Sequence, residues 1–334
     1  MRSLMRPRRV PTIPTIASNR SPLMTTQSEI DITESLAQSL VAISGLTLKE
    51  NEPLSRHTSF GIGGPADLFA IPSTVEALCS AIAAANDVGI RPLILGNGTN
   101  LIVRDGGIRG LVISISGKMS KIEIDGTEAV IEAGALLATI CHRLAGEGLS
   151  GFEFAAGIPG TLGGALIMNA GANGGEIGDV TEWVEVAAPD GTLKRVRCER
   201  LGFGYRCSAL RDAGVAVVRA GLRLKPGDAD EIHEALCDRI SRRCAKQPVS
   251  SPSAGCIFKR PEGDYAGRLI EEAGAKGMCV GRASVSSKHA NFMLNLGGAT
   301  AADVIGLIDA TRELVYDRFA VMLEAEVCVV GEDI

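Results

Sequence analysis

The pattern of apolar and polar positions along the chain predicts strands and helices in alternation from residue 67 onward. The apolar run at 67–71 predicts a short strand. Ser73 and Glu76 then form a capping box, which is the signature of a helix start. Apolar residues follow at helical spacing, at Val75, Leu78, Cys79 and Ile82. A strand followed by a helix is therefore the first predicted unit.

The same reasoning extends over the rest of the chain. Apolar runs between turn signals predict further strands at 91–95, 101–103, 111–115, 129–133, 184–188, 193–196, 215–224, 291–296 and 325–330. Apolar stripes of helical period predict helices around 136–144 and 232–240, and Thr300 begins a third. Strands dominate before the breaker cluster at 226–228 and helices become frequent after it, so we expect a domain boundary there.

Net charge narrows the classes of function open to the chain. The 334 residues carry 34 Lys and Arg against 39 Asp and Glu, and residues 29–334 alone carry a charge of −10. A body that acidic excludes a general nucleic-acid binder, because phosphate backbones need a basic face. The apolar runs are too short to span a membrane, and 46% hydrophobic residues exclude a disordered chain. We therefore expect a globular protein with neither nucleic acid nor a membrane as its partner.

The first 28 residues differ from the rest in composition. Residues 1–28 contain five arginines, four prolines and no acidic residue. This resembles an organellar transit peptide or, through Arg8 and Arg9, a twin-arginine signal. The alternative is a flexible tail, or a protein whose translation begins at Met24. We favour this alternative, because compositional signals of this kind are weak.

Cysteine usage favours a reducing compartment. The nine cysteines are odd in number and form no C-x-x-C pair, and the four histidines lie far from ligand spacing. Most of the cysteines fall in apolar stretches, so we expect them to be small core residues. A disulfide framework and a metal site are therefore not expected, and we place the protein in the cytoplasm.

Two glycine-rich loops follow predicted strands and are candidates for binding a cofactor. The first covers 95–101 with the sequence LGNGTNL. Consecutive backbone N–H groups without Cβ atoms, together with Thr and Asn donors, suit a diphosphate. Leu101 stands where a Rossmann fingerprint needs its third glycine, and no helix is predicted to follow. Taken alone, such a loop is also typical of a hairpin turn.

The second loop lies in the densest run of glycine in the chain. Nine of the 40 glycines fall within 151–178, and 157–164 has the sequence GIPGTLGG. Glycine is entropically costly, so this density indicates backbone held close to another group. That group is either a second subdomain packed across tight turns or a planar cofactor lying against the backbone, and we favour the cofactor. Backbone N–H groups, rather than a basic surface, would then bind its phosphates.

Seven segments, taken in order, carry a specific resemblance. They are HTSFGIGGPA at 57–66, LGNGTN at 95–100, GIPGTLGGALIMNAGA at 157–172, FGYR at 203–206, SAGCIFKRP at 253–261, KHANF at 288–292 and LEAEV at 323–327. In order and spacing the chain resembles the UDP-N-acetylenolpyruvoylglucosamine reductase (UDP-N-acetylmuramate dehydrogenase) family from about residue 45 to its C-terminus. Only 50 residues separate Arg206 from Cys256, which resembles the subtype without a tyrosine-bearing insertion.

This resemblance implies a fold and an activity. The implied fold is α+β, with a two-subdomain FAD-binding domain of the vanillyl-alcohol-oxidase (PCMH) type followed by a smaller α+β substrate-binding domain. The expected divisions are an extension at 1–28, a helix or linker at 29–55, the FAD-binding domain at 56–225 and the substrate domain at 226–334. Non-covalent FAD and the co-substrate NADPH would convert UDP-N-acetylglucosamine enolpyruvate to UDP-N-acetylmuramate for peptidoglycan, in a monomeric enzyme.

Roles for individual residues follow from the same resemblance. Arg206 and Glu326 fall at the family's charge-handling pair, and Cys256 falls at its proton donor, where most members carry Ser. A thiol is a stronger acid than an alkyl hydroxyl, so donation remains chemically reasonable. The alternative is that Cys256 is one more buried cysteine. The implied FAD contacts are Gly96, Asn97, Gly98, Thr99, Asn100, Gly157, Ile158, Gly160, Thr161 and Gly164. The implied substrate contacts are Lys246, Lys259 and Asn291, although both lysines could equally be solvated.

Two other classes of protein stay open at this point. The chain could be another FAD-dependent oxidoreductase of the same fold, some of which attach the flavin covalently. It could also be a flavin-binding paralogue without activity, although the intact set of Arg206, Cys256 and Glu326 argues against decay. A mass measurement on denatured protein distinguishes covalent from non-covalent flavin.

Overall fold

The computed structural model describes residues 26–334, with side chains from residue 32 onward. The predicted extension at 1–28 lies outside the described residues, apart from 26–28, which belong to helix α1 (Thr26–Val41). Its interpretation as a targeting segment or a tail therefore stays a prediction. Three groups of elements follow one another along the rest of the chain.

The first group is a mixed four-stranded sheet covered by helices α1 and α2 (Val75–Asp87). Its strands, in spatial order, are β1 (Leu46–Pro53), β2 (Pro65–Pro72), β5 (Ile108–Ser114) and β3 (Leu93–Leu95). β1 is antiparallel to β2, whereas β5 runs parallel to both β2 and β3. Thr74 caps α2 by accepting a hydrogen bond from Ala77 N at 3.1 Å. The cap predicted at Ser73 is wrong by one residue, because Ser73 Oγ donates to Gly45 O instead.

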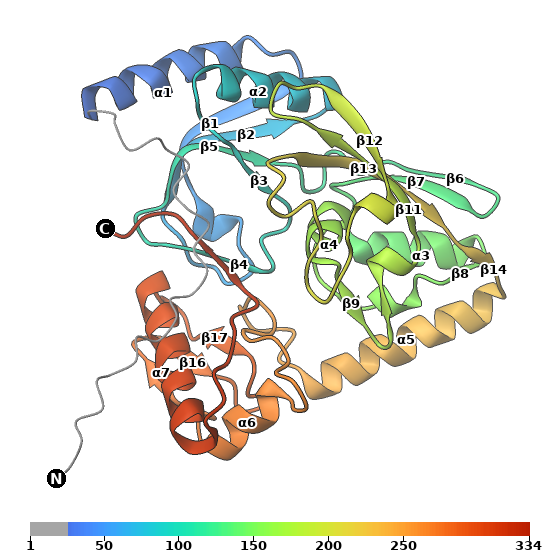
Figure 1. Ribbon diagram of the computed structural model, residues 1–334, viewed down its shortest axis with the longest axis vertical. Helices are drawn as coiled ribbons and strands as arrows, with labels where there is room; N and C mark the ends of the chain where they lie inside the picture. The colour runs from blue at the N-terminus through green and yellow to red at the C-terminus, as the bar shows by residue number, and fades with distance from the viewer. Residues whose placement is uncertain (1–25) are drawn as a thin grey trace.

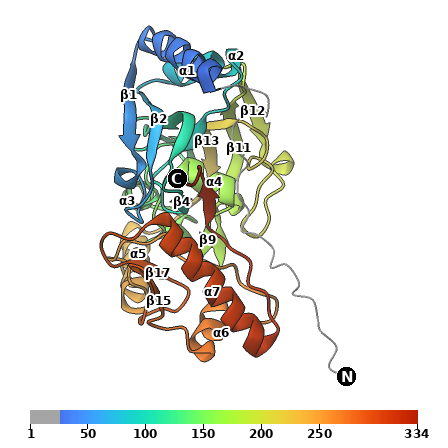
Figure 2. The same ribbon diagram turned by 90° about the vertical axis from the view of Figure 1, so that its left-hand side faces the viewer.

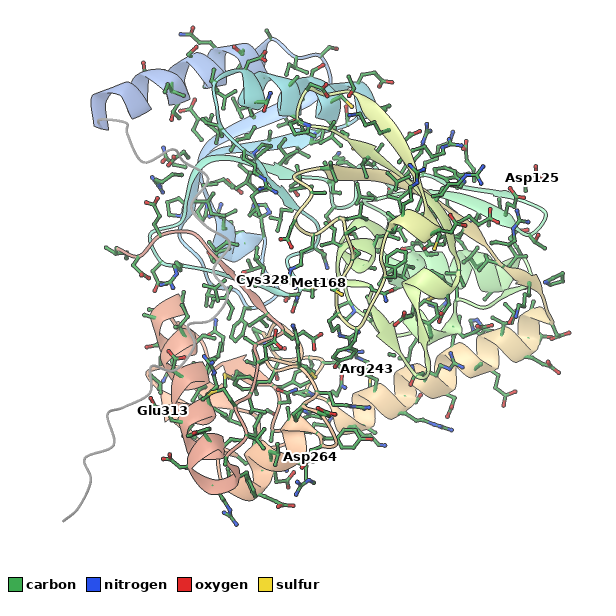
Figure 3. The ribbon with its side chains drawn as sticks, viewed as in Figure 1. Asp125, Met168, Arg243, Asp264, Glu313 and Cys328 are labelled. Atoms are coloured by element: carbon green, nitrogen blue, oxygen red, sulfur yellow. The ribbon has the colours of Figure 1, made fainter. Side chains whose placement is uncertain are left out.

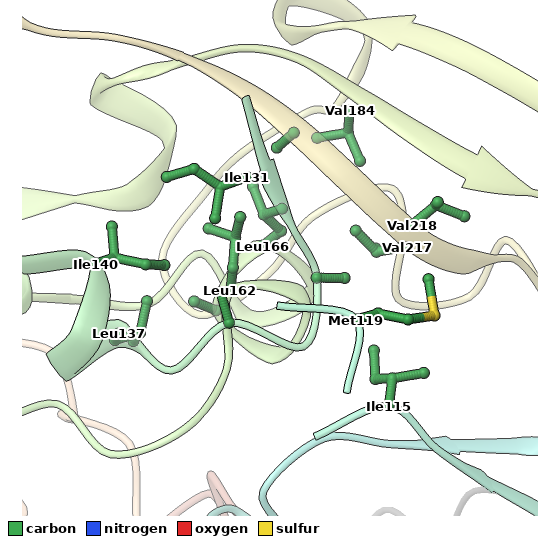
Figure 4. Packing of buried hydrophobic residues seen from close by; sticks show 14 of the residues in the cluster. Ile115, Met119, Ile131, Leu137, Ile140, Leu162, Leu166, Val184, Val217 and Val218 are labelled. Atoms are coloured by element: carbon green, nitrogen blue, oxygen red, sulfur yellow. The ribbon is translucent and has the colours of Figure 1, made fainter. Parts of the chain in front are cut away.

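The second group is a five-stranded antiparallel sheet that packs on two helices, α3 (Leu137–Gly146) and α4 (Leu162–Met168). Its strands, in spatial order, are β12 (Leu193–Arg197), β11 (Thr181–Ala187), β13 (Ala216–Arg223), β7 (Glu128–Glu132) and β6 (Ile122–Asp125). Figure 4 shows Leu162 and Leu166 of α4 beside Ile131 of the sheet. Helix α4 lies inside the glycine-rich run, where the sequence pattern predicted no helix.

Short elements complete these two groups. Two-stranded pairs are formed by β8 (Leu149–Ser150) with β14 (Lys225–Pro226) and by β9 (Gly171–Ala172) with β10 (Gly175–Glu176). The 3-10 helices are η1 (Leu54–Arg56), η2 (Glu153–Ala155), η3 (Ile177–Asp179) and η4 (Cys198–Arg200). η1 lies between β1 and β2, and the other three lie in the connections of the second group.

The third group begins after helix α5 (Ala229–Lys246) and contains two further helices and a small sheet. Its elements are α6 (Ala266–Ala273), β15 (Cys279–Val280), β16 (Ala283–Val285), β17 (Met293–Asn295) and α7 (Ala301–Phe319). Thr300 caps α7, as predicted, by accepting from Asp303 N at 3.0 Å. The chain then returns to the first group, because β18 (Cys328–Val330) pairs in parallel with β4 (Leu101–Val103). Figures 1 and 2 show α1 and α2 at one end of the molecule and α6 and α7 at the other.

The hydrophobic core changes from one cluster to the next at a different place from the domain boundary that the sequence predicts. The largest cluster spans the first two groups and includes Ile232 and Leu236 of α5, which packs against α3. A second cluster belongs to the third group and starts, in this part of the chain, at Ala254. The change of core therefore falls between Leu236 and Ala254, downstream of the boundary predicted at 226.

Candidate active site

A cavity lies where the three groups of elements meet. Its volume is about 1230 Å³, compared with roughly 300–1,000 Å³ for a typical small-molecule site. Both glycine loops line it, as do Arg206, Cys256 and Glu326. The structure thus brings the predicted cofactor loops and the three predicted catalytic residues to one space.

The first glycine loop connects β3 to β4 and can be built only with glycine. Gly98 has a φ of +59°, and a Cβ there would lie 2.2 Å from the His57 carbonyl oxygen. A Cβ at Gly96 would lie 2.6 Å from Thr161 Oγ1 of the second loop. Ser59 anchors the loop, because its N donates to Gly98 O at 3.1 Å while its Oγ donates to Ser253 O at 2.7 Å. Close approach of backbone, rather than a simple hairpin turn, therefore explains these glycines.

The second glycine loop lies directly against the first. Thr99 Oγ1 donates to Pro159 O at 3.4 Å, and Gly160 has a φ of +120°. Thr161 caps α4, since its Oγ1 accepts from Gly164 N at 3.5 Å. All the predicted FAD contacts line the cavity except Gly157. The two loops together form one continuous wall of backbone.

A short ladder of backbone bonds brings Cys256 and Glu326 to the part of the cavity wall beside the first glycine loop, where Asn100 Nδ2 donates to Glu326 O at 3.2 Å. Cys256 bridges Phe292, and Phe258 bridges Ala325, both in antiparallel fashion. Glu326 N donates to Ile257 O at 2.7 Å. The residues of this ladder come from three segments that are far apart in the sequence, and their side chains meet at the cavity only after folding.

Arg206 reaches the same wall from a tight turn. Its φ is +56°, which is uncommon for a non-glycine residue and marks a backbone conformation held by its surroundings. Nη1 donates to Gly171 O at 3.1 Å. Nε lies 2.7 Å from Oε1 of Glu326, an ion pair in which the Nε–H direction is not aligned for a hydrogen bond. The expected pairing of Arg206 with Glu326 is thus present in the structure.

Burial sets the protonation of the two acidic groups on this wall. It raises the pKa of the Cys256 thiol to about 11, assisted by the Glu326 carboxylate and opposed by the Arg243 and Arg206 guanidinium groups. Burial also raises the pKa of Glu326, and the Arg206 charge opposes this shift. The Cys256 thiol is therefore protonated at neutral pH, as a proton donor requires.

Four further arginines line the cavity without acidic partners. Among the residues that the structure describes, none of them makes an ion pair; they are Arg91, Arg211, Arg243 and Arg260. Arg243 Nε and the nearby Gln247 Oε1 are both buried and lack hydrogen-bond partners within the described part of the chain. Figure 3 shows Arg243 near the end of α5, below the labelled Met168 and Cys328. An unpartnered buried group is costly, so Arg243 in particular is suited to an anionic ligand.

Gly157 is the one predicted FAD contact that does not line the cavity. It has a φ of +77°, and a Cβ there would lie 2.9 Å from Arg243 Cδ. The bare backbone of Gly157 therefore makes room for the Arg243 side chain at the edge of the cavity.

The structure does not bring the three predicted substrate contacts to the cavity. Lys246 is exposed on the last turn of α5, and Lys259 pairs with Glu324. Asn291 is only 6% exposed and binds the backbone of Phe258. Their positions favour surface or structural roles over direct contact with a ligand in this cavity.

Sequence reasoning missed Arg243 and Gln247, although a signal for them exists. The buried face of α5 contains Ile232, Leu236 and the partly buried Ile240. Continuing that face at helical spacing leads to residues 243 and 247, which therefore point inward. Lys246 lies off that face, which explains why it is solvated.

The described residues meet the requirements of neither a membrane-spanning helix nor a metal site. Over residues 26–334, no helix is both long and apolar enough to cross a bilayer. The same residues contain no group of three or more His, Cys, Asp or Glu side chains placed to hold a metal ion.

Comparison with known proteins covers both parts of the chain. Residues 66–197 match a family described as an FAD binding domain, and residues 247–330 match one described as UDP-N-acetylenolpyruvoylglucosamine reductase, C-terminal domain. The reductase of that name from Alkaliphilus oremlandii is 47% identical over 283 residues, which is 85% of this chain and 93% of that protein. Its namesake from Clostridioides difficile is 44% identical over 86% of this chain and 94% of that protein. The crystal structure of the Thermus caldophilus reductase is 38% identical with a TM-score of 0.74, and the match covers 85% of this chain and 98% of that one.

Proposed function

The chain belongs to the UDP-N-acetylenolpyruvoylglucosamine reductase family, and we propose that it converts UDP-N-acetylglucosamine enolpyruvate to UDP-N-acetylmuramate with electrons from NADPH. It is an FAD-containing oxidoreductase of cell wall synthesis. The observation that carries the detailed proposal is the cavity, where two backbone loops face the group of Arg206, Cys256 and Glu326.

The glycine loops fit FAD. Gly96 and Gly98 let the loop backbone approach its neighbours closely, and Arg91 and Arg211 line the same cavity without an ion pair among the described residues. Backbone donors and unpaired guanidinium groups are both suited to a diphosphate. FAD, when bound, supplies the hydride chemistry of the reaction. The protein's own task is to hold charges and a proton in position beside it.

We assign the substrate's developing negative charge to Arg206. Reduction of the enolpyruvyl group builds negative charge next to a carboxylate, and a fixed cation in a partly buried site stabilises it. The ion pair with Glu326 at 2.7 Å holds the guanidinium at one place on the cavity wall. Before the substrate binds, the Glu326 carboxylate offsets the positive charge of Arg206.

Cys256 is the proposed proton donor. Its S–H bond would break as a C–H bond forms at the substrate carbon next to the carboxylate, which leaves a thiolate on the enzyme. The raised pKa of the thiol, about 11, keeps the proton in place until that carbon is basic enough to take it. Arg206 and Arg243 then stabilise the thiolate, since both charges act to lower that pKa.

We assign the diphosphate of the UDP-sugar to Arg243 and Arg260, in place of Lys246 and Lys259. Both arginines line the cavity, whereas neither lysine does. The unpartnered Oε1 of Gln247 would accept a hydrogen bond from a hydroxyl or amide of the same ligand. A cytoplasmic monomer is proposed on the same basis as the activity, and the nine free cysteines are consistent with a reducing compartment.

The purified protein tests this proposal directly. It should be yellow, NADPH should bleach the flavin absorbance, and the enolpyruvyl UDP-sugar should restore it. Denaturation should release FAD of unmodified mass, whereas a covalent adduct would indicate another oxidoreductase of the same fold. A colourless protein with no affinity for FAD, or a bleached flavin that the UDP-sugar fails to reoxidise, would refute the activity.

A further inference from the structure

The side chain of Asn291 binds the backbone beside the proposed proton donor. Asn291 is 6% exposed. Its Oδ1 accepts from Phe258 N at 2.9 Å, and its Nδ2 donates to Phe258 O at 2.8 Å. A single planar amide thus satisfies both polar groups of one buried residue. Such a paired contact fixes the position and the rotation of that peptide segment.

That segment carries one catalytic side chain and pairs with the segment that carries another. On one side, Ile257 N donates to Asn291 O at 2.9 Å, and Cys256 bridges Phe292. On the other side, Ile257 O accepts from Glu326 N at 2.7 Å. The amide of Asn291 therefore lies at the junction of the three segments and controls how Cys256 and Glu326 stand relative to each other.

Asn291 also acts on the thiol itself. Nδ2 donates to Phe258 O, and the same side chain acts to lower the pKa of Cys256, against the larger effect of burial. The amide thus fixes the backbone two residues after Cys256 and also influences the thiol's pKa. No charged side chain could do this at so buried a position without a large desolvation cost.

We propose that Asn291 is a positioning residue for the proton-donation step, which holds Cys256 at its working distance from Glu326 and makes no contact with the substrate. This inference rests on the proposed function. It assigns to Asn291 an effect on one chemical step and none on ligand binding, and this separates it from a substrate contact.

The test replaces the amide and follows the two half-reactions separately. Asn291→Leu removes both side-chain bonds at similar volume, and Asn291→Asp keeps the acceptor but loses the donor. In Asn291→Leu, reoxidation of the flavin by the UDP-sugar should slow by about 10²-fold, the loss expected when a reacting group is displaced by about 1 Å. In this variant, bleaching by NADPH and the KM for the UDP-sugar should stay unchanged. The reoxidation rate of Asn291→Asp should lie between those of Asn291→Leu and the wild type. A raised KM with a normal reoxidation rate would overturn the proposal in favour of a substrate contact.

Two controls separate positioning from general damage. Thr311 is also buried in the same domain and its Oγ1 donates to Leu307 O at 2.7 Å, far from Cys256 along the chain. Thr311→Val should lower the temperature of unfolding but leave both half-reactions unchanged. In a Cys256→Ala background, Asn291→Leu should slow reoxidation no further, because the residue that it positions is already gone. An additive loss in that background would overturn the inference, whereas near-normal reoxidation in Cys256→Ala alone would instead refute the donor assignment.

Discussion

The cavity is lined by backbone on the side of the glycine loops and by side chains on the side of the C-terminal domain. The loop side is built around Gly96, Gly98 and Gly160, at positions where a Cβ would lie 3.0 Å or less from a neighbouring atom. The other side is built from Cys256, Glu326, Arg243 and Arg260, and neither arginine has an acidic partner among the described residues. One side can bind through N–H groups common to every residue, while the other depends on individual functional groups.

This difference explains how an acidic protein binds phosphate-bearing ligands. The chain carries a net charge of −5, yet four arginines line the cavity without an ion pair among the described residues. Positive charge is therefore concentrated where the ligands bind, although the surface as a whole is acidic. The expectation that backbone N–H groups, rather than a basic surface, bind the phosphates of the cofactor therefore concerns the loop side only.

The largest expected effect lies on the side-chain side. Cys256→Ala should slow substrate reduction by about 10²–10⁴-fold, the usual contribution of a general acid, while NADPH still reduces the flavin. Cys256→Ser should keep substantial turnover, because a hydroxyl can take over the donor position. Stopped-flow absorbance of the flavin measures both half-reactions. If the Ala variant reduces substrate at a near-normal rate, another group is the donor.

The sequence predicted the loop side well, because glycine itself is the signal. The glycines of the loops can be recognised directly in the sequence, and the loop at 95–101 does line the cavity. The predicted α+β fold is confirmed, with an FAD binding domain followed by a reductase C-terminal domain. Helix α4 was missed because Gly163 and Gly164 weaken its helical signal. The helix forms there because Thr161 caps it and because Gly163 N donates to Ala133 O at 2.8 Å.

The side-chain side could not be derived from the residues alone. Cys256 and Glu326 are 70 positions apart, and only the backbone ladder through Phe258 brings them together. Their proposed roles came from a resemblance, and no periodicity would have paired them. Lys246 was selected for its charge, whereas the fold selects Arg243 because it continues the buried face of α5.

The second prediction tests the loop side with a matched pair of glycines. Gly98 and Gly126 have nearly equal φ values, +59° and +58°, but a Cβ at Gly126 would meet nothing within 4 Å. Each Gly→Ala change costs roughly 1–2 kcal/mol for the left-handed backbone. Gly98→Ala adds a collision with the His57 carbonyl oxygen, so it alone should lower FAD affinity, by at least about tenfold. Fluorescence titration of released flavin measures this affinity.

The control variant is well separated from the site. Gly126 follows Asp125 at the tip of the β6–β7 hairpin, and Figure 3 shows Asp125 far from Met168 and Cys328. Gly126→Ala should lower the temperature of unfolding slightly and leave flavin content unchanged. Equal flavin loss in both variants would mean that backbone strain, and not the close approach at Gly98, controls binding on the loop side.

The third prediction compares two cations on the last turns of α5. Arg243→Ala should raise the KM for the UDP-sugar by about 10- to 10²-fold, since a charge-assisted hydrogen bond contributes about 1.5–3 kcal/mol. Lys246→Ala removes the same charge from an exposed position and should change KM little. Steady-state kinetics at fixed NADPH measures both. A larger effect at Lys246 than at Arg243 would restore the sequence-based assignment.

The smallest expected effect is a rate that hardly changes with pH, and it tests the burial of the donor. An unperturbed thiol has a pKa of about 8.5, so raising the pH to about 9.5 would leave roughly a tenth of it protonated. Burial raises the pKa of Cys256 to about 11, so the thiol keeps its proton over that range and flavin reoxidation by substrate should stay level. The rate falls only as the pH approaches this raised value, because the deprotonated form cannot donate. Cys256→Ser provides the reference, since a hydroxyl does not titrate there. A tenfold decline in the wild type between about pH 7.5 and 9.5, absent from Cys256→Ser, would show that the thiol is solvated during turnover and that the side-chain wall is more open than the structure describes.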